Sequence, residues 1–421
     1  MFRTVRVPFK SNGVGRSKVV VLPTPGSAAS YFTRHCGSGA AEPGLQPQGR
    51  DLPLETLRRR TERLTGLLRR LHLPQLSHFT AFGQEYLLPL RASSPPVPLR
   101  DIPQHQVEYL TGFFDGDGCV TPAVGLASCT LSACQVSNAA EVLVLFHRLL
   151  GGGIYRKFAG RGLRKPALQW VINGVEGKRV ASVLSQVPSM KRPQLLLAVD
   201  WPSCVSKRPH AKSSLKDLKQ GSSSVSIPWS WWYFTGFFDA EGSIRVPPKS
   251  VGINLEVTQN SRELLIALRV FLVQEFPGLS VGIYRNRNAH VLKVWKFEAS
   301  CFILRRMLSC GLLVKRRHAE VALQLSSDNH FQIRDSLSEL NGNGSRYSRL
   351  DADGCLRSQR ISFVMRSARA GTATNRALLR NLREEHILLN TRLWYAQLRK
   401  DIRELLSNGA SVNSKPASGI G

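Results

Sequence analysis

The sequence lacks two features that would assign it to other classes of protein. No stretch approaches the run of about 18 apolar residues that a membrane-spanning helix needs, which excludes that class. None of its eight cysteines stands in a CxxC pair or at the spacing of a zinc site. We therefore expect reduced, mostly buried thiols in an intracellular protein. The cysteines are at positions 36, 119, 129, 134, 204, 301, 310 and 355.

Acidic residues are also scarce. The chain has 58 Lys and Arg against 29 Asp and Glu, so its formal net charge is +29. An excess of that size predicts a polyanionic partner, of which nucleic acid is the commonest, although a membrane surface or ribosomal RNA would favour the same charge. With 42% hydrophobic residues over 421 positions, the chain can form packed cores in two or three domains.

The N-terminal segment is poor in acids and in periodicity. Its first acid is Glu42, which follows six Lys and Arg. Residues 1–95 are predicted to form a basic, largely irregular extension, within which leucines at helical spacing predict a short basic helix over 52–73. The start of this extension fits two origins equally well: an imported precursor with an organellar transit peptide, or an organelle-encoded reading frame.

A nine-residue pattern occurs twice in the chain. LTGFFDGDG spans residues 110–118 and FTGFFDAEG spans residues 234–242, an offset of 234 − 110 = 124 residues. The tripeptide Ile-Tyr-Arg is also repeated, at 154–156 and 283–285. Internal repetition of this kind predicts two similar units, and each unit supplies one matched carboxylate to a shared site.

The order of elements around the repeats predicts two α+β units in tandem. The first unit is placed at 101–200 and the second at 226–326, and the segment 201–225, rich in Ser and Lys, is predicted to be a linker. In each unit we expect a motif helix, alternating strands, an amphipathic helix, a further strand and a closing helix. Residues 327–421 are predicted to be a C-terminal extension, polar and turn-rich at first and with a basic helix over 376–407. The first strand of each unit is placed at 126–136 and at 253–257.

Small residues recur four positions apart in each motif. Gly112 and Gly116 in the first copy correspond to Gly236 and Ala240 in the second. Residues without bulk at this spacing let two helix backbones approach closely, which compensates for the helix propensity of about 1 kcal/mol that each glycine loses relative to alanine. The pattern therefore predicts that the two motif helices pack on each other.

The last acid of each motif, Asp117 or Glu241, would then lie at the C-terminal end of its helix, close to the other. Two carboxylates at the negative ends of two helix dipoles repel each other, and a divalent cation relieves that repulsion. Mg²⁺ (or Mn²⁺) suits such a site because it prefers hard oxygen ligands, keeps several waters and coordinates phosphate oxygens. Carboxylates and a metal ion beside a basic surface predict hydrolysis of a phosphodiester. A third D-x-D-G, at 351–354, follows no apolar helix and is predicted to be a solvated turn.

With these two motifs, the chain resembles the single-chain form of the LAGLIDADG homing endonuclease family over about residues 101–325. The resemblance implies two pseudo-symmetric αββαββα subdomains in tandem, with the motif helices packed at their interface and the sheets forming a saddle for DNA. It implies that Asp115 and Asp239 are structural and cap the helix ends. The metal ligands that it implies are Asp117 and Glu241, with the backbone carbonyls of Gly116 and Ala240.

The resemblance also nominates further site residues. Asn138 and Gln259, just after a strand in each unit, are expected to order the water near the scissile phosphate. Lys191 and Lys315, which differ by 315 − 191 = 124 positions, are expected to assist that water or to neutralise transition-state charge. The alternative for either lysine is an ordinary phosphate contact.

Residues of the strands are candidates for DNA binding, through base edges or phosphates. Because side chains alternate along a strand, about half of them are expected to face away from the DNA. The candidates are Tyr155, Arg156, Lys157, Arg161, Arg164 and Gln169 in the first unit, and Arg245, Lys249, Asn254, Tyr284, Arg285, Arg287, Asn288 and Lys293 in the second.

The function predicted is that of a monomeric, Mg²⁺-dependent endonuclease that cuts both strands of a long, asymmetric, nearly palindromic DNA target and so initiates intron or gene mobility. It would act in a chloroplast or mitochondrion, with no membrane partner. One alternative is a maturase that binds its host intron RNA and assists splicing, and another is a nucleic-acid-binding protein without catalysis. Degenerate members of the family tend to lose an acid, so the presence of both favours cleavage.

Overall fold

The computed structural model describes residues 53–91, 98–220, 229–248, 250–342, 344–367 and 373–412. The first part of the N-terminal extension, to which the transit-peptide prediction applies, and the DNA-binding candidate Lys249 lie outside the described residues. Among the helices in the described part of the chain, none has both the length and the apolar character needed to cross a membrane.

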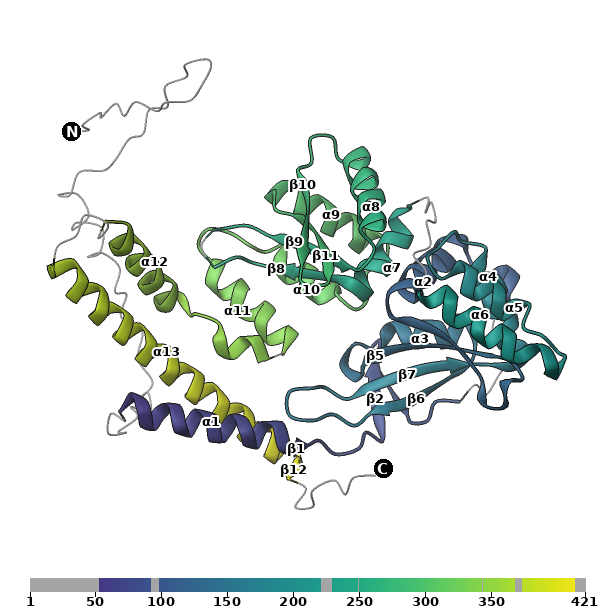
Figure 1. Cartoon of the computed structure of the whole chain (residues 1–421), viewed down its shortest axis with the longest axis horizontal. Coiled ribbons are helices and arrows are strands. Elements are labelled where there is room, and N and C mark those ends of the chain that lie inside the picture. The colour runs from purple at the N-terminus through teal and green to yellow at the C-terminus, as the bar shows by residue number, and fades with distance from the viewer. Residues whose placement is uncertain are drawn as a thin grey trace, which may run out of the picture. The chain divides into compact units, whose positions relative to one another are not determined.

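The first unit is a motif helix followed by a four-stranded antiparallel sheet of order β4-β5-β7-β6 (Figure 1). One face of the sheet is apolar because the strands alternate: in β7, Leu168, Trp170 and Ile172 are buried and the residues between them are partly exposed. Helix α3 packs its apolar side chains into the same core. The elements are α2 (Gln104–Asp117), β4 (Gly118–Pro122), β5 (Cys129–Val136), α3 (Glu141–Leu150), β6 (Gly153–Phe158), β7 (Ala167–Ile172), α4 (Gly174–Ser185) and α5 (Arg192–Val199).

The second unit repeats this order. Its sheet has the order β8-β9-β11-β10, which matches the first sheet strand for strand. Two αββαββα units in tandem are therefore confirmed. The elements are α7 (Trp231–Glu241), β8 (Gly242–Arg245), β9 (Asn254–Gln259), α8 (Arg262–Glu275), β10 (Val281–Asn286), β11 (Ala289–Val294), α9 (Phe297–Ser309) and α10 (Arg316–Ala322).

The strand that directly follows each motif, β4 or β8, is absent from the sequence prediction, which began the strands at 126 and 253. Each motif helix passes into its strand without a turn. The glycine after the helix, Gly118 or Gly242, already has extended backbone angles (φ −82°, ψ 160° and φ −78°, ψ 160°). With no turn residue to mark the change, the sequence pattern gave no boundary there.

The two motif helices α2 and α7 pack on each other at their small residues, as predicted. A Cβ added to Gly112 would overlap the Tyr233 carbonyl, and one added to Gly236 would overlap the Tyr109 carbonyl. A Cβ added to Gly116 would likewise overlap that of Ala240. The backbones are thus in direct contact, and only glycine fits at the closest points.

The structure corrects the prediction that residues 201–225 form a linker. Most of it forms helix α6 (Arg208–Gln220), which lies beside α5 (Figure 1). Its buried residues, Ala211 and Leu215, are one turn apart and join the main core, while its Ser and Lys side chains are mostly exposed. Most residues of this helix are Ser, Lys and other polar types, and that composition is why the sequence predicts a linker here.

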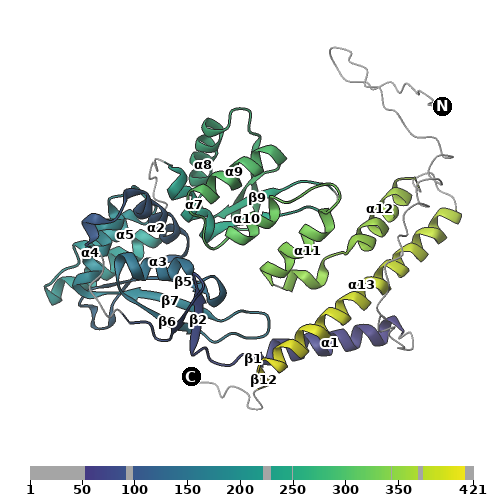
Figure 2. The ribbon, with the colours of Figure 1, turned by 180° about the vertical axis from the view of Figure 1, so that it is seen from behind.

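The two terminal extensions also differ from the prediction, because they form one module. Helix α1 (Leu54–Arg70) packs along α13 (Ala373–Ser407), and β1 (Leu71–His72) pairs with β12 (Ser411–Val412) (Figures 1 and 2). We call these four elements the terminal module. A second hydrophobic core holds it together, formed by Leu68, Leu71, Leu398, Ile402 and Ala410.

The segments next to the terminal module are more ordered than predicted. The N-terminal extension, predicted to be largely irregular, contains the hairpin β2 (His78–Ala81) and β3 (Gln84–Leu87) in addition to α1. The segment predicted to be turn-rich holds α11 (His330–Asn341) and α12 (Ala352–Ser367). The third D-x-D-G is the start of α12 and not a free turn, because the Asp351 carboxylate accepts a hydrogen bond from the Gly354 N–H at 2.7 Å.

Candidate active site

The acids Asp117 and Glu241 are the last residues of α2 and α7 and lie beside each other. A Cβ added to Gly116, the residue before Asp117, would be 3.1 Å from Cγ of Glu241. Each acid also stands at the junction between its motif helix and the following strand. Helix packing therefore brings one carboxylate from each unit to a common point.

The local environment raises the pKa of both acids. Burial raises the pKa of Asp117 to about 6; the Lys315 ammonium opposes this rise, and the Glu241 carboxylate adds to it. Burial likewise raises the pKa of Glu241, against the ammonium groups of Lys191 and Lys315 and a hydrogen bond from Gln259. Asp117 still reaches solvent and Glu241 is half-buried, and two carboxylates that repel each other there favour a proton or a cation between them.

Lys191 and Lys315 bind the backbone at the ends of the motif helices. The Lys191 ammonium donates to the carbonyls of Phe114 (2.9 Å), Gly116 (3.3 Å) and Gly118 (2.6 Å). The Phe114 and Gly116 carbonyls belong to the last turn of α2, where the helix dipole is negative, and the Gly118 carbonyl is at the start of β4. The Gly116 carbonyl, an expected metal ligand, is thus in contact with Lys191, which leaves one of its two lone pairs for a metal.

In the second unit the Lys315 ammonium donates to the Asp239 carbonyl, near the end of α7. Burial lowers the pKa of both lysines, and the Asp115 carboxylate opposes this for Lys191 as Asp239 does for Lys315. Both ammonium groups also act on Asp117 and Glu241. The shared offset of the lysines therefore corresponds to a shared position beside the acid pair.

Asp115 and Asp239 act on a different helix end from the one expected. Each was expected to cap the end of its own helix. Instead, each carboxylate accepts two backbone N–H bonds from the loop that carries a lysine, at 2.6 and 2.9 Å for Asp115 and at 2.7 and 2.8 Å for Asp239. Lys191 and Lys315 are the residues just before α5 and α10, so the two carboxylates stabilise the N-terminal ends of those helices. They fix the loops that position the lysines.

Two tyrosines, which the sequence reasoning missed, connect the units through these carboxylates. The Tyr109 hydroxyl on α2 donates to Asp239 on α7 at 2.7 Å, and the Tyr233 hydroxyl on α7 donates to Asp115 on α2. Burial raises the pKa of both tyrosines, so the hydroxyls stay protonated as donors. Their offset is 233 − 109 = 124, and that number was the signal in the sequence that could have found them.

The same offset corrects the pairing of Asn138 with Gln259. Strand register places Gln259 at the position of Gln135, because each lies two residues beyond the partner of the motif's last glycine. Their separation is again 259 − 135 = 124. Gln259 lies close enough to Glu241 to lower the pKa of that acid, so the equivalent candidate in the first unit is Gln135.

Asn138 lies beyond the strand, in a short 3₁₀ turn over Ser137–Ala139. It lines a cavity of about 280 Å³ together with Lys315, Arg317 and His318. It is therefore close to a lysine of the second unit, although it does not occupy the position equivalent to Gln259.

Strand alternation separates the DNA-binding candidates. Arg156 pairs across the sheet with Leu168 and so shares the helix-covered face, and Arg285 pairs with His290 in the same way. Lys157 stands at an irregularity of β6. The candidates in the turns between paired strands are Arg161, Arg164, Arg287 and Asn288. The candidates on the open faces of the sheets are Tyr155, Gln169, Arg245, Asn254, Tyr284 and Lys293.

An acid that was not predicted stands among these cations. Glu256 lies opposite Lys293 on the open face of the second sheet, and its carboxylate is 2.8 Å from the Lys293 ammonium. Arg245 approaches the same carboxylate at 3.7 Å, and the Glu256 side chain is only 12% exposed. Two of the DNA-binding candidates are thus paired with one carboxylate in the free protein.

The donor set of the site suits a hard cation. Across the described residues, no group of three or more His, Cys, Asp and Glu side chains could hold a metal ion. Asp117 and Glu241 therefore offer two carboxylates only, and water or phosphate oxygens would have to complete the coordination. That requirement fits Mg²⁺, which is usually held by one or two carboxylates and retains waters.

No protein-family model and no curated protein matches the sequence. Solved structures do match it. They are LAGLIDADG meganucleases. I-AabMI, bound to uncleaved DNA, is 19% identical over 56% of this chain and 96% of its own, with a TM-score of 0.42. I-SmaMI, bound to an uncleaved DNA target in the presence of calcium ions, is 14% identical over 57% and 98%, with a TM-score of 0.41.

I-CpaMI, bound to uncleaved DNA, is 15% identical over 55% of this chain and 98% of its own, with a TM-score of 0.40. At these identities and TM-scores, the likeness to such meganucleases carries no conclusion about activity.

Proposed function

We propose that the chain is a site-specific homing endonuclease that hydrolyses both strands of double-stranded DNA with the help of a divalent metal ion. The observation that carries this proposal is the meeting of Asp117 and Glu241, one from each of two similar units, with Lys191 and Lys315 beside them. Two related half-sites about a pseudo-twofold axis suit the two antiparallel strands of a duplex. A single chain supplies both half-sites, so the active species would be a monomer.

Asp117 and Glu241 would hold Mg²⁺ or Mn²⁺. When bound, such an ion supplies Lewis acidity that polarises a phosphate oxygen and lowers the pKa of a water. The chain's own residues do the rest. Lys191 and Lys315 would offset the negative charge at the helix ends, and Gln259, beside Glu241, would orient the attacking water.

Recognition of DNA would use the open faces of the two sheets. Base edges in the major groove are read by Arg, Lys, Asn and Gln, which the open-face candidates supply, and the net charge of +29 favours phosphate contacts at many other positions. The first sheet offers Tyr155 and Gln169 where the second offers Asn254 and two cations tied to Glu256. Because the two faces differ, the target would be long and asymmetric within a nearly palindromic frame.

Cutting both strands of this long target is the step that would start intron or gene mobility. The acid-poor N-terminal segment supports action in a chloroplast or mitochondrion. Both acids of the pair are present, and for that reason we favour cleavage over an intron maturase and over a nucleic-acid-binding protein without catalysis.

The test is cleavage of a plasmid that carries the DNA flanking this reading frame, joined without it. The purified full-length protein should linearise the plasmid with Mg²⁺ or Mn²⁺ and should stop when EDTA is added. Asp117→Asn and Glu241→Gln should abolish cutting, whereas Asp353→Asn, in the look-alike at 351–354, should leave it unchanged. If the protein binds this DNA without cutting it, the endonuclease proposal is wrong, and a splicing assay with the host intron then decides for or against the maturase.

A further inference from the structure

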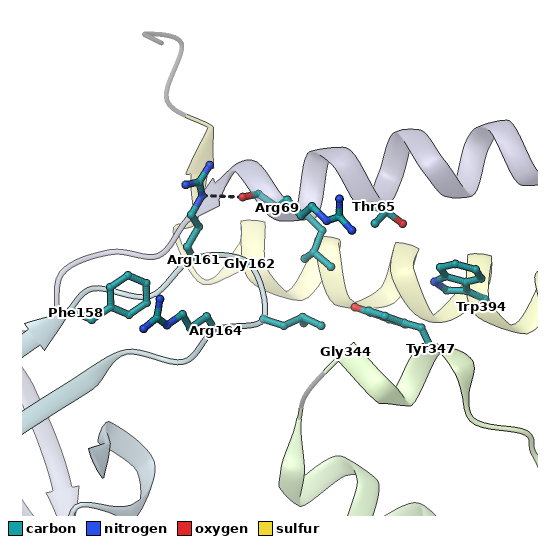
Figure 3. A pocket seen from close by; sticks show the side chains of 11 residues that line it. Thr65, Arg69, Phe158, Arg161, Gly162, Arg164, Gly344, Tyr347 and Trp394 are labelled. Atoms are coloured by element: carbon teal, nitrogen blue, oxygen red, sulfur yellow. Dashed lines mark hydrogen bonds between the residues drawn. The ribbon is translucent and has the colours of Figure 1, made fainter. Parts of the chain in front are cut away.

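A cavity of about 680 Å³ lies where the terminal module meets the turn between β6 and β7 (Figure 3). The motif helices and the acid pair contribute nothing to its lining. The lining comes from α1, the β6–β7 turn, the 3₁₀ turn before α12 and α13, which are far apart in sequence. Its volume is typical of a ligand site, for which about 300–1,000 Å³ is usual.

The lining combines aromatic rings with arginines. The rings are Phe158, Tyr347 and Trp394 and the arginines are Arg69, Arg161 and Arg164, and among the described residues that line the cavity none is acidic. Figure 3 shows Trp394 and Tyr347 along one side of the cavity and Arg161, Arg164 and Phe158 at the other end. A site with planar faces and three guanidinium groups suits a ligand with planar rings and negative charge.

Internal contacts hold several of these groups in place. The Arg164 guanidinium stacks over the Phe158 ring at 4.1 Å, and the Arg161 side chain donates to the Arg69 carbonyl at 2.7 Å (Figure 3). The Tyr347 hydroxyl donates at 2.6 Å to Asp401, a buried carboxylate that also pairs with Arg346. Because that acid is already paired twice, it leaves the cavity electropositive. The cavity is thus pre-organised and not a gap between loose side chains.

A second cavity, of about 590 Å³, continues the first along α1 and α13. The two share Thr65, Arg69 and Trp394, and the second adds Arg58 together with one acid, Glu62. Trp394 therefore lies between two hollows, with arginines beside each. An elongated groove with a ring at its middle suits a linear polymer better than a compact nucleotide.

We propose that this groove, which we call the aromatic–arginine groove, binds single-stranded RNA. Bases would stack on Trp394 and Tyr347, while Arg58, Arg69 and Arg164 would contact phosphates. A duplex keeps its base faces covered by stacking and exposes only edges, so it cannot use these rings. RNA loops, bulges and ends present unstacked bases, whereas cellular DNA is mainly duplex, and this favours RNA as the ligand.

The test is fluorescence anisotropy of the full-length protein with a labelled oligouridylate of about 12 nucleotides, a length within the usual range of single-strand sites. Trp394→Ala should weaken binding about 10-fold or more, because one stacked base is lost. Trp394→Phe keeps a ring and should restore most of the affinity. Leu393→Ala, a change at the neighbouring, exposed position of α13 outside the cavity lining, should have no effect and controls for damage to the helix.

Two further measurements fix the ligand class. Oligothymidylate of the same length offers the same base faces and phosphates, so it should lose affinity with Trp394→Ala as oligouridylate does, and a DNA duplex should bind equally well to the protein with and without Trp394→Ala. The proposal is overturned if Trp394→Ala leaves oligouridylate binding unchanged, or if it weakens RNA, single-stranded DNA and duplex equally. Cleavage of the plasmid by the Trp394→Ala protein should be normal, so failure of the nuclease proposal would be seen separately.

Discussion

Tyr109 and Tyr233 each donate a hydrogen bond to an aspartate of the other unit, and this predicts that the two halves of the site are coupled. Tyr109→Phe removes only a hydroxyl, yet that hydroxyl reaches from α2 to Asp239 of the other unit. Asp239 in turn holds the loop that ends at Lys315. We therefore expect a change in the first unit to disturb the lysine of the second, and Tyr233→Phe to disturb Lys191 in the reverse direction.

The size of the effect follows from the contacts. Asp239 is fully buried and accepts two backbone N–H bonds in addition to the tyrosine hydroxyl. Loss of one bond to a buried charged group costs about 1.5–3 kcal/mol, so Tyr109→Phe should lower the free energy of unfolding by that amount. A shift of the loop by a fraction of an ångström should slow catalysis at the adjacent half-site about 10-fold.

Two assays separate stability from positioning. Urea unfolding gives the loss of stability, with Tyr395→Phe as the matched control, because the Tyr395 ring is partly exposed and its contact is a cation–π interaction with Arg399. Cleavage of a duplex labelled on each strand gives the rate for each strand. Tyr109→Phe and Tyr233→Phe should accumulate nicked DNA with the nick on opposite strands.

A purely structural role for the tyrosines would slow both strands alike. The coupling is therefore refuted if either variant keeps the ratio of the two strand rates of the original protein. It is also refuted if Tyr109→Phe costs no more stability than Tyr395→Phe.

Three further outcomes are expected. Glu256 pairs with two cations, and Glu256→Gln frees them. Nonspecific DNA affinity should therefore rise, and the salt dependence of binding should steepen by about one phosphate contact. A shallower salt dependence would contradict this. Gly112→Ala should lower the free energy of unfolding by about 1–3 kcal/mol through overlap with the facing helix, whereas Gly66→Ala, with open space around it on α1, should raise it by up to about 1 kcal/mol. Leu398→Ala removes a fully buried leucine from the second core, so hydrogen exchange should rise in α1 and α13 and stay slow in α2 and α7; a uniform rise would refute the separate module.

Several features could be read from the sequence because they depend on short-range patterns. The small residues at Gly112 and Gly236 predicted a close helix contact, and the structure places each against the facing backbone. Alternation in β7 and periodicity in α3 marked the first core. The offset of 124 related the lysines correctly and could also have found Gln135 and the tyrosines.

Other features depend on contacts that no local pattern records. Helix α6 is mostly polar in composition, like a linker, and its sequence does not show which surface Ala211 and Leu215 pack against. The role of Asp115 was misassigned because its partners are backbone groups at the far end of the unit, and a backbone donor leaves no trace in the residue types.

The sequence by itself determined that the chain has two matched units, that their helices meet at glycines, and which acid of each motif ends the helix. These properties follow from spacing along the chain, which a repeat makes visible twice. Only the tertiary structure decided that Lys191 and Lys315 cover the helix ends, that each tyrosine serves the opposite unit, and that the two termini join in one module. Those contacts connect residues about 70 to 340 positions apart, and nothing in a local pattern specifies which distant surface a side chain or backbone group will meet.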